Sequence, residues 1–168
     1  MAQPLKQPPY SVHAEGVVLG TLLRHPELFE QLHAILGDGS VFFRGQYERF
    51  FKVMVTTHAS TEGLDHVALM TEAARSGLHE MSQRADLDAL ISVASHPDHA
   101  IELARMINDK ALLRELIDLL SDILHDASRT ADPFGVVLRR ARGRLDEFDS
   151  PLAGQPATAA AHGRNRRP

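Results

Sequence analysis

Apolar side chains recur every three or four positions along most of the chain, and no segment shows the strict alternation of a β-strand. In one segment the apolar positions follow the i, i+3, i+4, i+7 spacing of a helix face: Tyr47, Phe50, Phe51 and Met54. Several short segments share this periodicity and are separated by polar turns. The pattern predicts an all-α fold in which residues 10–96 form a compact helical head.

Start and stop signals frame these short segments. Ser11 and Asp65 are of the residue types that cap helix N-termini, and Pro26 suits the first position of a helix. Gly37 and Gly77 stand where helices are expected to end. For the helix that opens at Asp65, the spacing predicts these inward side chains: Val67, Met70 and Ala74.

A longer helix is predicted to begin near Pro97 and to continue to about residue 128, a length of roughly 45 Å at 1.5 Å per residue. Neither proline nor glycine interrupts it after Pro97, and residues 112–124 are mostly Leu and Ile. These residues form two neighbouring apolar stripes. One stripe contains Leu113, Leu116, Ile117, Leu120 and Leu124, and the other contains Leu112, Leu119 and Ile123. Because one partner helix covers one stripe of ordinary width, the second stripe needs another partner.

A further helix is predicted after Asp132, its expected cap, and Pro133, its expected first residue. Its apolar face contains Phe134, Val137, Leu138, Ala141, Leu145 and Phe148. A short turn between two such helices predicts an antiparallel helical hairpin over residues 97–149, in the same domain as the head. The surplus stripe favours self-association over the alternative that the head folds back onto it. The predicted interface contains Leu112, Leu116, Leu119, Ile123, Phe134 and Leu138.

Both ends of the chain lack apolar periodicity, so we expect a flexible N-terminus over residues 1–9 and a disordered basic tail over residues 150–168. The net charge is −4 and there is no cysteine, which excludes disulfides, thiolate zinc sites and cysteine nucleophiles. The start of the chain lacks the pattern of a signal peptide, and no apolar run approaches the roughly 20 residues that span a bilayer. We therefore expect a cytoplasmic protein with no membrane contact.

Motifs of catalysis are missing from the sequence. It contains neither the phosphate-binding pattern GxxxxGKS or GxxxxGKT nor GxGxxG, and neither HExxH nor the nucleophile pattern GxSxG. We interpret His96, Asp98 and His99 as a helix start with exposed imidazoles rather than as metal ligands. The sequence thus predicts no catalytic residue, no cofactor and no metal.

One basic patch lies on the second arm of the predicted hairpin and contains Arg139, Arg140, Arg142 and Arg144. We interpret it as a solvated, ion-paired outer face. The alternative is a contact for an acidic protein or a nucleic-acid backbone, and a nucleic-acid contact would make the chain a small nucleic-acid-binding regulator that uses this patch and the basic tail. Nucleic acid would then be a weak partner, because few arginines give few phosphate contacts.

Three segments resemble the N-terminal domain of replicative DnaB-type helicases. Residues 8–23 read PPYSVHAEGVVLGTLL and match the start of that domain at Glu15, Val18, Leu19 and Gly20. Residues 41–51 read VFFRGQYERFF and match at Phe42, Arg44, Phe50 and Phe51. Residues 100–117 read AIELARMINDKALLRELI and match the long helix best, at residues 111–116. The chain departs from the family at His13, Val41 and Tyr47, and no RecA-like motor follows.

The resemblance implies a noncatalytic domain, because the ATPase and DNA-unwinding residues of the family have no counterparts here. In that family the hairpins pair, the dimers form a ring collar, and the collar recruits primase. The resemblance therefore implies a homodimer or higher ring that docks primase or a replicative helicase in DNA replication. We expect either an excised domain of an ATP-dependent helicase or a standalone relative, and Met1 and the unusual tail favour the standalone protein.

Overall fold

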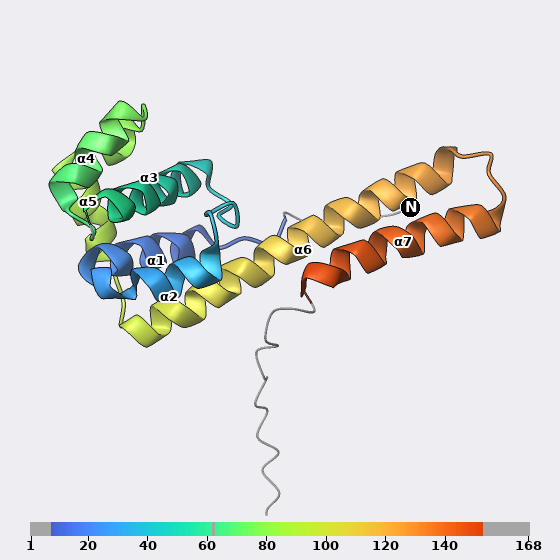
Figure 1. Ribbon diagram of the computed structural model, residues 1–168, viewed down its shortest axis with the longest axis horizontal. Coiled ribbons are helices and arrows are strands. Elements are labelled where there is room, and N and C mark those ends of the chain that lie inside the picture. The colour runs from blue at the N-terminus through green and yellow to red at the C-terminus, as the bar shows by residue number, and fades with distance from the viewer. Residues whose placement is uncertain (1–7, 62, 153–168) are drawn as a thin grey trace, which may run out of the picture. The chain divides into compact units, whose positions relative to one another are not determined.

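The computed structural model describes residues 8–61 and 63–152 and is helical throughout, with no strand among these residues (Figure 1). The predicted all-α fold class is confirmed. The chain divides into two compact units, which we call the head unit (described residues up to Glu115) and the hairpin unit (described residues from Leu116). The head unit contains α1 (Val12–Arg24), η1 (Pro26–Leu28), α2 (Phe29–Leu36), α3 (Gly45–Thr61), α4 (His66–Arg75), η2 (His79–Met81), α5 (Arg84–Ser92) and the first part of α6 (Pro97–Arg129). The hairpin unit contains the rest of α6 and α7 (Phe134–Leu152).

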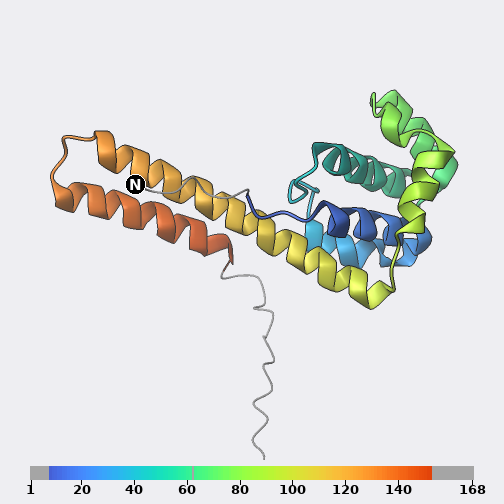
Figure 2. The same ribbon diagram turned by 180° about the vertical axis from the view of Figure 1, so that it is seen from behind.

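Helix α1 forms the centre of the head unit. Every residue from Ala14 to Leu23 is buried, as expected of a helix that is covered on all sides. It contacts α5, α3 and η1, and Figure 2 shows it directly below α3. The predicted cap is confirmed, since the Ser11 hydroxyl oxygen accepts the N–H of Ala14 at 3.4 Å.

The other start and stop signals in the head unit are also confirmed. The Asp65 carboxylate accepts the N–H of Ala68 at 2.8 Å at the start of α4. Pro26 is the first residue of η1, which leads directly into α2. Gly37 ends α2 with a φ of 58°, a conformation that favours glycine.

The predicted inward face of α4 is wrong. Leu69 and Ala73 are buried, whereas Ala74 is exposed and Val67 is 66 % exposed. Met70 is half-buried. Apolar residues occupy more than one side of this ten-residue helix, so its spacing alone does not select the side that packs against α3 and η2.

Helix α6 is continuous from Pro97 to Arg129, which confirms the predicted long helix. All of its buried residues lie in its first half: Ala100, Ile101, Ala104, Ile107 and Ala111. These side chains belong to the compact head unit, so that unit reaches Glu115 instead of ending at the predicted boundary of residue 96. The separate hairpin unit begins correspondingly later than residue 97.

The two predicted loose ends lie largely outside the described residues. Of the predicted flexible segment 1–9, residues 8 and 9 are described, and the carbonyl of Pro9 accepts a hydrogen bond from Arg114 Nη1 at 2.9 Å. Of the predicted tail 150–168, residues 150–152 belong to α7, and residues 153–168 are outside the described part. Within the described ranges, no helix is long and apolar enough to cross a membrane.

Candidate functional site: the two sides of the helical hairpin

Helix α7 runs back antiparallel alongside the second half of α6, which confirms the predicted hairpin (Figure 1, Figure 2). Ile123 of α6 lines one narrow groove together with Val137 and Ala141 of α7. Helix α7 begins at Phe134, directly after Pro133, so proline precedes the helix instead of being its first residue. The apolar contact along this groove is the seam of the hairpin.

Ion pairs close one side of this seam. The Arg144 guanidinium donates to Asp122 and to Asp126 of α6, each at 3.1 Å. Near the turn, Arg140 Nη2 donates to Asp132 Oδ2 at 3.0 Å, so this carboxylate binds a side chain of α7. Hydrogen bonds from Thr130 and Arg140 lower the pKa of Asp132, which keeps it ionised.

The predicted arginine patch is therefore divided between two roles. Arg140 and Arg144 are engaged by carboxylates of the hairpin unit itself. The placement of Arg144 on the outer face is wrong, because its side chain reaches back across the seam to α6. Arg139 and Arg142 are exposed and form no ion pair with any residue in the described ranges.

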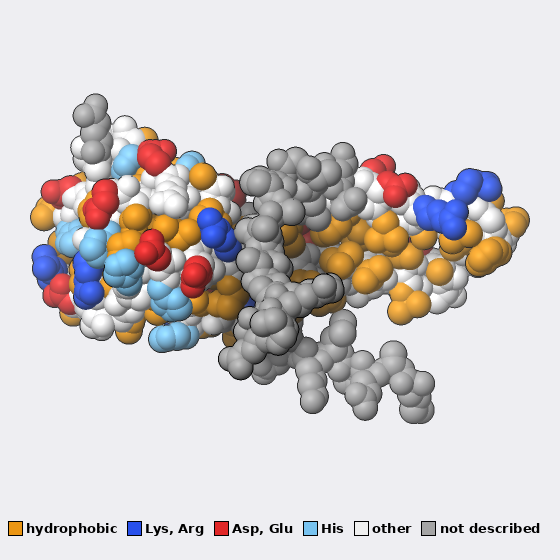
Figure 3. Space-filling view, turned by 90° about the horizontal axis from the view of Figure 1, so that it is seen from below, with side chains coloured by type: hydrophobic (Ala, Val, Ile, Leu, Met, Phe, Trp, Pro, Cys, Tyr) orange, Lys and Arg blue, Asp and Glu red, His pale blue; other side chains and the backbone are white. Residues whose placement is uncertain are grey.

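The other side of the seam is apolar. Leu120 is 47 % exposed and Leu124 is 68 % exposed on α6, while Phe134 is 79 % exposed on α7. At 100° per residue, Leu120 and Leu124 lie on the flank of α6 opposite Asp122 and Asp126. Figure 3 shows hydrophobic side chains in a band along the hairpin. We call Leu120, Leu124, Phe134, Leu138 and Leu145 the apolar side of the hairpin.

The six residues predicted as a self-association interface lie in different surroundings. Phe134 is exposed and Ile123 lines the seam with α7. The remaining four are half-buried: Leu112, Leu116, Leu119 and Leu138. The sequence analysis identified the stripe of Leu120 and Leu124 but placed the interface on the neighbouring stripe of Ile123, whereas the structure leaves Leu120 and Leu124 exposed. One sequence signal could have identified this exposed side. Asp122 and Asp126 lie four residues apart on one flank of α6, and such a pair can bind an arginine of α7 on that flank, which leaves the opposite flank exposed.

A buried carboxylate organises the head unit. Glu15 is buried on α1, and its two oxygens accept the N–H groups of Phe43 at 2.8 Å and Arg44 at 3.2 Å. Burial raises the pKa of Glu15, although the two N–H groups and the guanidinium of Arg114 act in the opposite direction. The carboxylate thereby fixes the loop that leads into α3.

Arg114 fixes the same loop from α6. Its guanidinium donates to the carbonyl oxygens of Pro9 at 2.9 Å and Val41 at 2.7 Å. It also lies over the ring of Phe43, 5.7 Å from the ring centroid, and Tyr10 stacks on that ring. Glu15 and Arg114, both in segments that resemble the helicase domain, therefore have structural roles.

The described residues contain no cluster of three or more His, Asp or Glu side chains that could hold a metal ion. His96, just before α6, lies 3.6 Å from Asp98, and His99 lies 3.8 Å from Glu102 in the first turns of α6. These short-range pairs agree with the interpretation of exposed imidazoles.

Comparison with known proteins identifies the family of this chain. The family model described as the DnaB-like helicase N terminal domain matches residues 7–109. The chain is 28 % identical over 141 residues to the replicative DNA helicase DnaB of Geobacillus stearothermophilus, covering 83 % of this chain and 31 % of that protein. It is 30 % identical over 129 residues to the replicative DNA helicase DnaB of Rhodothermus marinus, covering 75 % of this chain and 13 % of that protein.

The fold has a solved counterpart in the crystal structure of the N-terminal domain of DnaB helicase from Mycobacterium tuberculosis. The two superpose with a TM-score of 0.71 at 24 % sequence identity, over 84 % of this chain and 99 % of that chain. The chain spans at most 31 % of the length of the two replicative helicases above. With its match to the family model over residues 7–109, the chain belongs to the family of DnaB-like helicase N-terminal domains.

Proposed function

We propose that this chain is a noncatalytic assembly domain of the replicative-helicase type, which self-associates through the hairpin and docks a second replication protein. The exposed apolar side of the hairpin is the observation that carries the proposal. The family membership supports a role in DNA replication, and the sequence contributes no nucleotide-hydrolysis motif of its own.

The unequal sides of the hairpin support self-association. Ion pairs from Arg144 to Asp122 and Asp126 occupy one side, and with α7 in this orientation the leucines on the opposite side stay exposed. Single exposed apolar residues are ordinary, but neighbouring large ones mark an interaction surface. Full burial of a leucine or phenylalanine contributes about 1.5–3 kcal/mol. A second copy is the simplest occupant, because the same apolar side on both copies forms a self-complementary twofold interface.

The contact set combines prediction and structure. Of the predicted residues, Phe134 belongs to the interface and the half-buried Leu116 and Leu138 flank it, while Leu112 and Leu119 share the stripe of Ile123. Leu120 and Leu124 join this set as its exposed centre. Ile123 supports it from within the seam.

A double variant tests this interface. Leu120→Asp with Leu124→Asp should convert the protein to a monomer in sedimentation equilibrium while its helical circular dichroism stays unchanged. Ser121→Asp is the matched control, because it adds a carboxylate at an exposed position of the same helix without removing apolar surface. A wild-type protein that is monomeric at every concentration, or a double variant that associates like the wild type, contradicts the proposal.

The docked protein is proposed to be primase or a replicative helicase, because the relatives of this chain are replicative helicases. Purified primase and helicase from the source organism should each be tested for binding by analytical ultracentrifugation. Binding of either one supports the docking role. Absence of binding by both overturns it while leaving self-association intact.

A second candidate function is weak nucleic-acid binding. It is favoured by Arg139 and Arg142, which are exposed and lack ion pairs within the described residues. Each phosphate contact contributes about one unit to the slope of log affinity against log salt concentration. Replacing both arginines with glutamine should therefore lower that slope by about two. An unchanged slope removes this candidate.

A further inference from the structure

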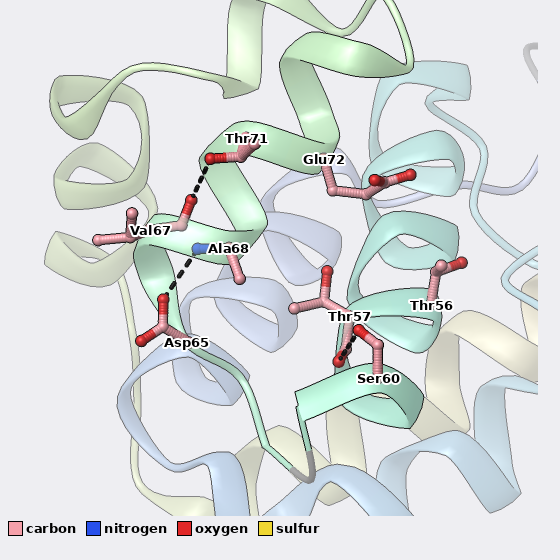
Figure 4. Close-up of a pocket in the computed structure, with 8 residues that line it drawn as sticks. All are labelled: Thr56, Thr57, Ser60, Asp65, Val67, Ala68, Thr71 and Glu72. Atoms are coloured by element: carbon pink, nitrogen blue, oxygen red, sulfur yellow. Dashed lines mark hydrogen bonds between the residues drawn. The ribbon is translucent and has the colours of Figure 1, made fainter.

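A cleft of about 410 Å³ separates α3 from α4 in the head unit. Hydroxyl and carboxylate groups from α3, from α4 and from the turn between them line it: Thr56, Thr57, Ser60, Asp65, Thr71 and Glu72. Figure 4 shows these side chains around the space between the two helices. Thr56, Ser60, Asp65 and Thr71 are exposed at the rim of the cleft, whereas Thr57 is buried.

Three of the hydroxyl groups donate their only proton to a carbonyl oxygen of their own helix. Thr56 donates to the carbonyl of Lys52 at 3.0 Å, and Thr71 donates to the carbonyl of Val67 at 2.8 Å. Ser60 donates to the carbonyl of Thr57 at 2.9 Å. Because a carbonyl only accepts, these hydroxyl groups keep lone pairs and no proton for a ligand. The cleft therefore presents acceptors.

Thr57 is the unsatisfied group of the cleft. Its side chain is buried, with 2 % of the residue exposed, and its Oγ1 has no hydrogen-bond partner among the described residues. In Figure 4 the side chain extends from α3 into the space between α3 and α4. A buried hydroxyl without a partner is destabilising. Because the Thr57 hydroxyl keeps its lone pairs as well as its proton, a donor group inserted between the helices would make one hydrogen bond to it that the folded protein leaves unmade.

The charge at the cleft is negative. Glu72 binds Arg75 through two hydrogen bonds, at 2.7 Å and 2.8 Å, which lower the pKa of Glu72 and offset its charge. Asp65 Oδ1 accepts the N–H of Ala68, and this carboxylate has no cationic partner among the described residues. Lys52 is held by Glu48 at 2.6 Å. The uncompensated charge is therefore that of Asp65.

We propose that this cleft binds the cationic end of a lysine or arginine side chain that a partner protein presents. Ammonium and guanidinium groups bring only donors, which match the acceptors of the cleft, and a positive charge, which matches Asp65. Val67, 66 % exposed, and Ala68 line the same cleft and offer an apolar wall for the methylene stem of such a side chain. The inference deepens the docking role proposed above and uses residues separate from those of the hairpin.

The test is a titration of the full chain, followed through its backbone amide NMR signals, with N-acetyl-arginine amide and N-acetyl-lysine amide. Saturable shifts at Thr57, Ala68 and Thr71 are expected with at least one of these two probes. N-acetyl-citrulline amide, which has the shape of the arginine probe without its charge, should give no saturable shift. Equal shifts with citrulline, or none with the cationic probes, overturn the proposal. Tighter binding of spermidine than of both probes would assign the cleft to free polyamines and also overturn it.

Two variants separate binding from folding. Thr57→Val removes the unpaired hydroxyl at nearly constant volume and should weaken probe binding about tenfold while thermal stability is kept or raised. Asp65→Asn keeps a good helix cap and removes the charge, so it should weaken binding about threefold. Thr130→Val makes the same replacement in the hairpin unit, away from the cleft; it is the matched control and should bind the probes like the wild type.

Unchanged affinity in Thr57→Val and Asp65→Asn would overturn the assignment of the cleft. Such a result would leave the hairpin proposal standing, because the Leu120 and Leu124 variants test that proposal separately. Conversely, monomeric wild-type protein with saturable probe binding would reject hairpin self-association and retain the cleft.

Discussion

The main chains of Gly20 and Leu90 meet with no room for a side chain between them. A Cβ atom at Gly20 of α1 would overlap the carbonyl carbon and oxygen of Leu90 on α5. Beside this contact, the N–H of Ser95 donates to Thr21 Oγ1 at 2.9 Å. Gly20, one of the residues that resembles the helicase family, is therefore required by close helix packing.

Gly20→Ala should lower the free energy of unfolding by about 1–3 kcal/mol or more, because the obstructing atoms belong to the main chain and cannot rotate away. Urea unfolding followed by circular dichroism measures this loss. Gly45→Ala is the control, since a Cβ built there meets no side chain and no other segment of the described chain within 4 Å. That variant should be neutral or more stable by up to about 1 kcal/mol. Equal losses in both variants would contradict the packing argument.

Glu15 should make the stability of the protein depend on pH. Burial raises the pKa of Glu15 in the folded state above its ordinary value of 4.5, which unfolding restores. The folded state therefore binds more protons in this range, so stability rises as pH falls through the folded pKa toward 4.5 and declines as pH rises.

Comparison with Glu15→Gln isolates this effect, because the other titrating groups are common to both proteins. The unfolding free energy of the wild type minus that of Glu15→Gln should increase as the pH is lowered toward 4.5, and should be constant above the folded pKa. Urea midpoints across this pH range provide the measurement. A difference that shrinks on acidification would contradict the raised pKa.

The features that the sequence predicted correctly depend on near neighbours. Ser11 and Asp65 cap helices through N–H groups three residues away, and the break-free run after Pro97 determines the length of α6. The features that it missed depend on distant groups. Arg144 meets Asp122 and Asp126 only after the turn brings α7 back, and this pairing determines which leucine stripe stays exposed.

The cleft was also out of reach of sequence reasoning. Threonines such as Thr56 and Thr71 have ordinary helical surroundings in the sequence, and each donates to a carbonyl of its own helix. Thr57 becomes unusual only because α4 packs over it without supplying a partner. Periodicity assigned Val67 to the core for the same reason, since the position of α4 on α3 is a tertiary property.

Arg114→Met should loosen the loop before α3. The variant keeps the stem of the side chain and loses the hydrogen bonds to Pro9 and Val41, which should cost about 1–3 kcal/mol of unfolding free energy. Hydrogen exchange should accelerate first at the amides of Phe43 and Arg44. Arg105→Met, at an exposed position of the same helix, is the control and should leave these amides unchanged. Protection that is equal in the two variants would show that Arg114 does not hold the loop.

Adjacent positions on α6 should respond in opposite ways to the same substitution. Ile123→Asp places a carboxylate in the seam beside Val137 and Ala141, so it should lower the melting temperature and the helix content of the protein. Leu124→Asp replaces a side chain that is 68 % exposed, so it should leave the melting temperature of the isolated chain within a few degrees of the wild-type value and weaken self-association. Thermal unfolding and sedimentation equilibrium, run on both variants at low and high protein concentration, separate the two effects. The opposite result would be a stable Ile123→Asp monomer together with an unfolded Leu124→Asp protein. It would mean that α7 packs on the stripe of Leu120 and Leu124, and that the apolar side of the hairpin lies on the other flank of α6.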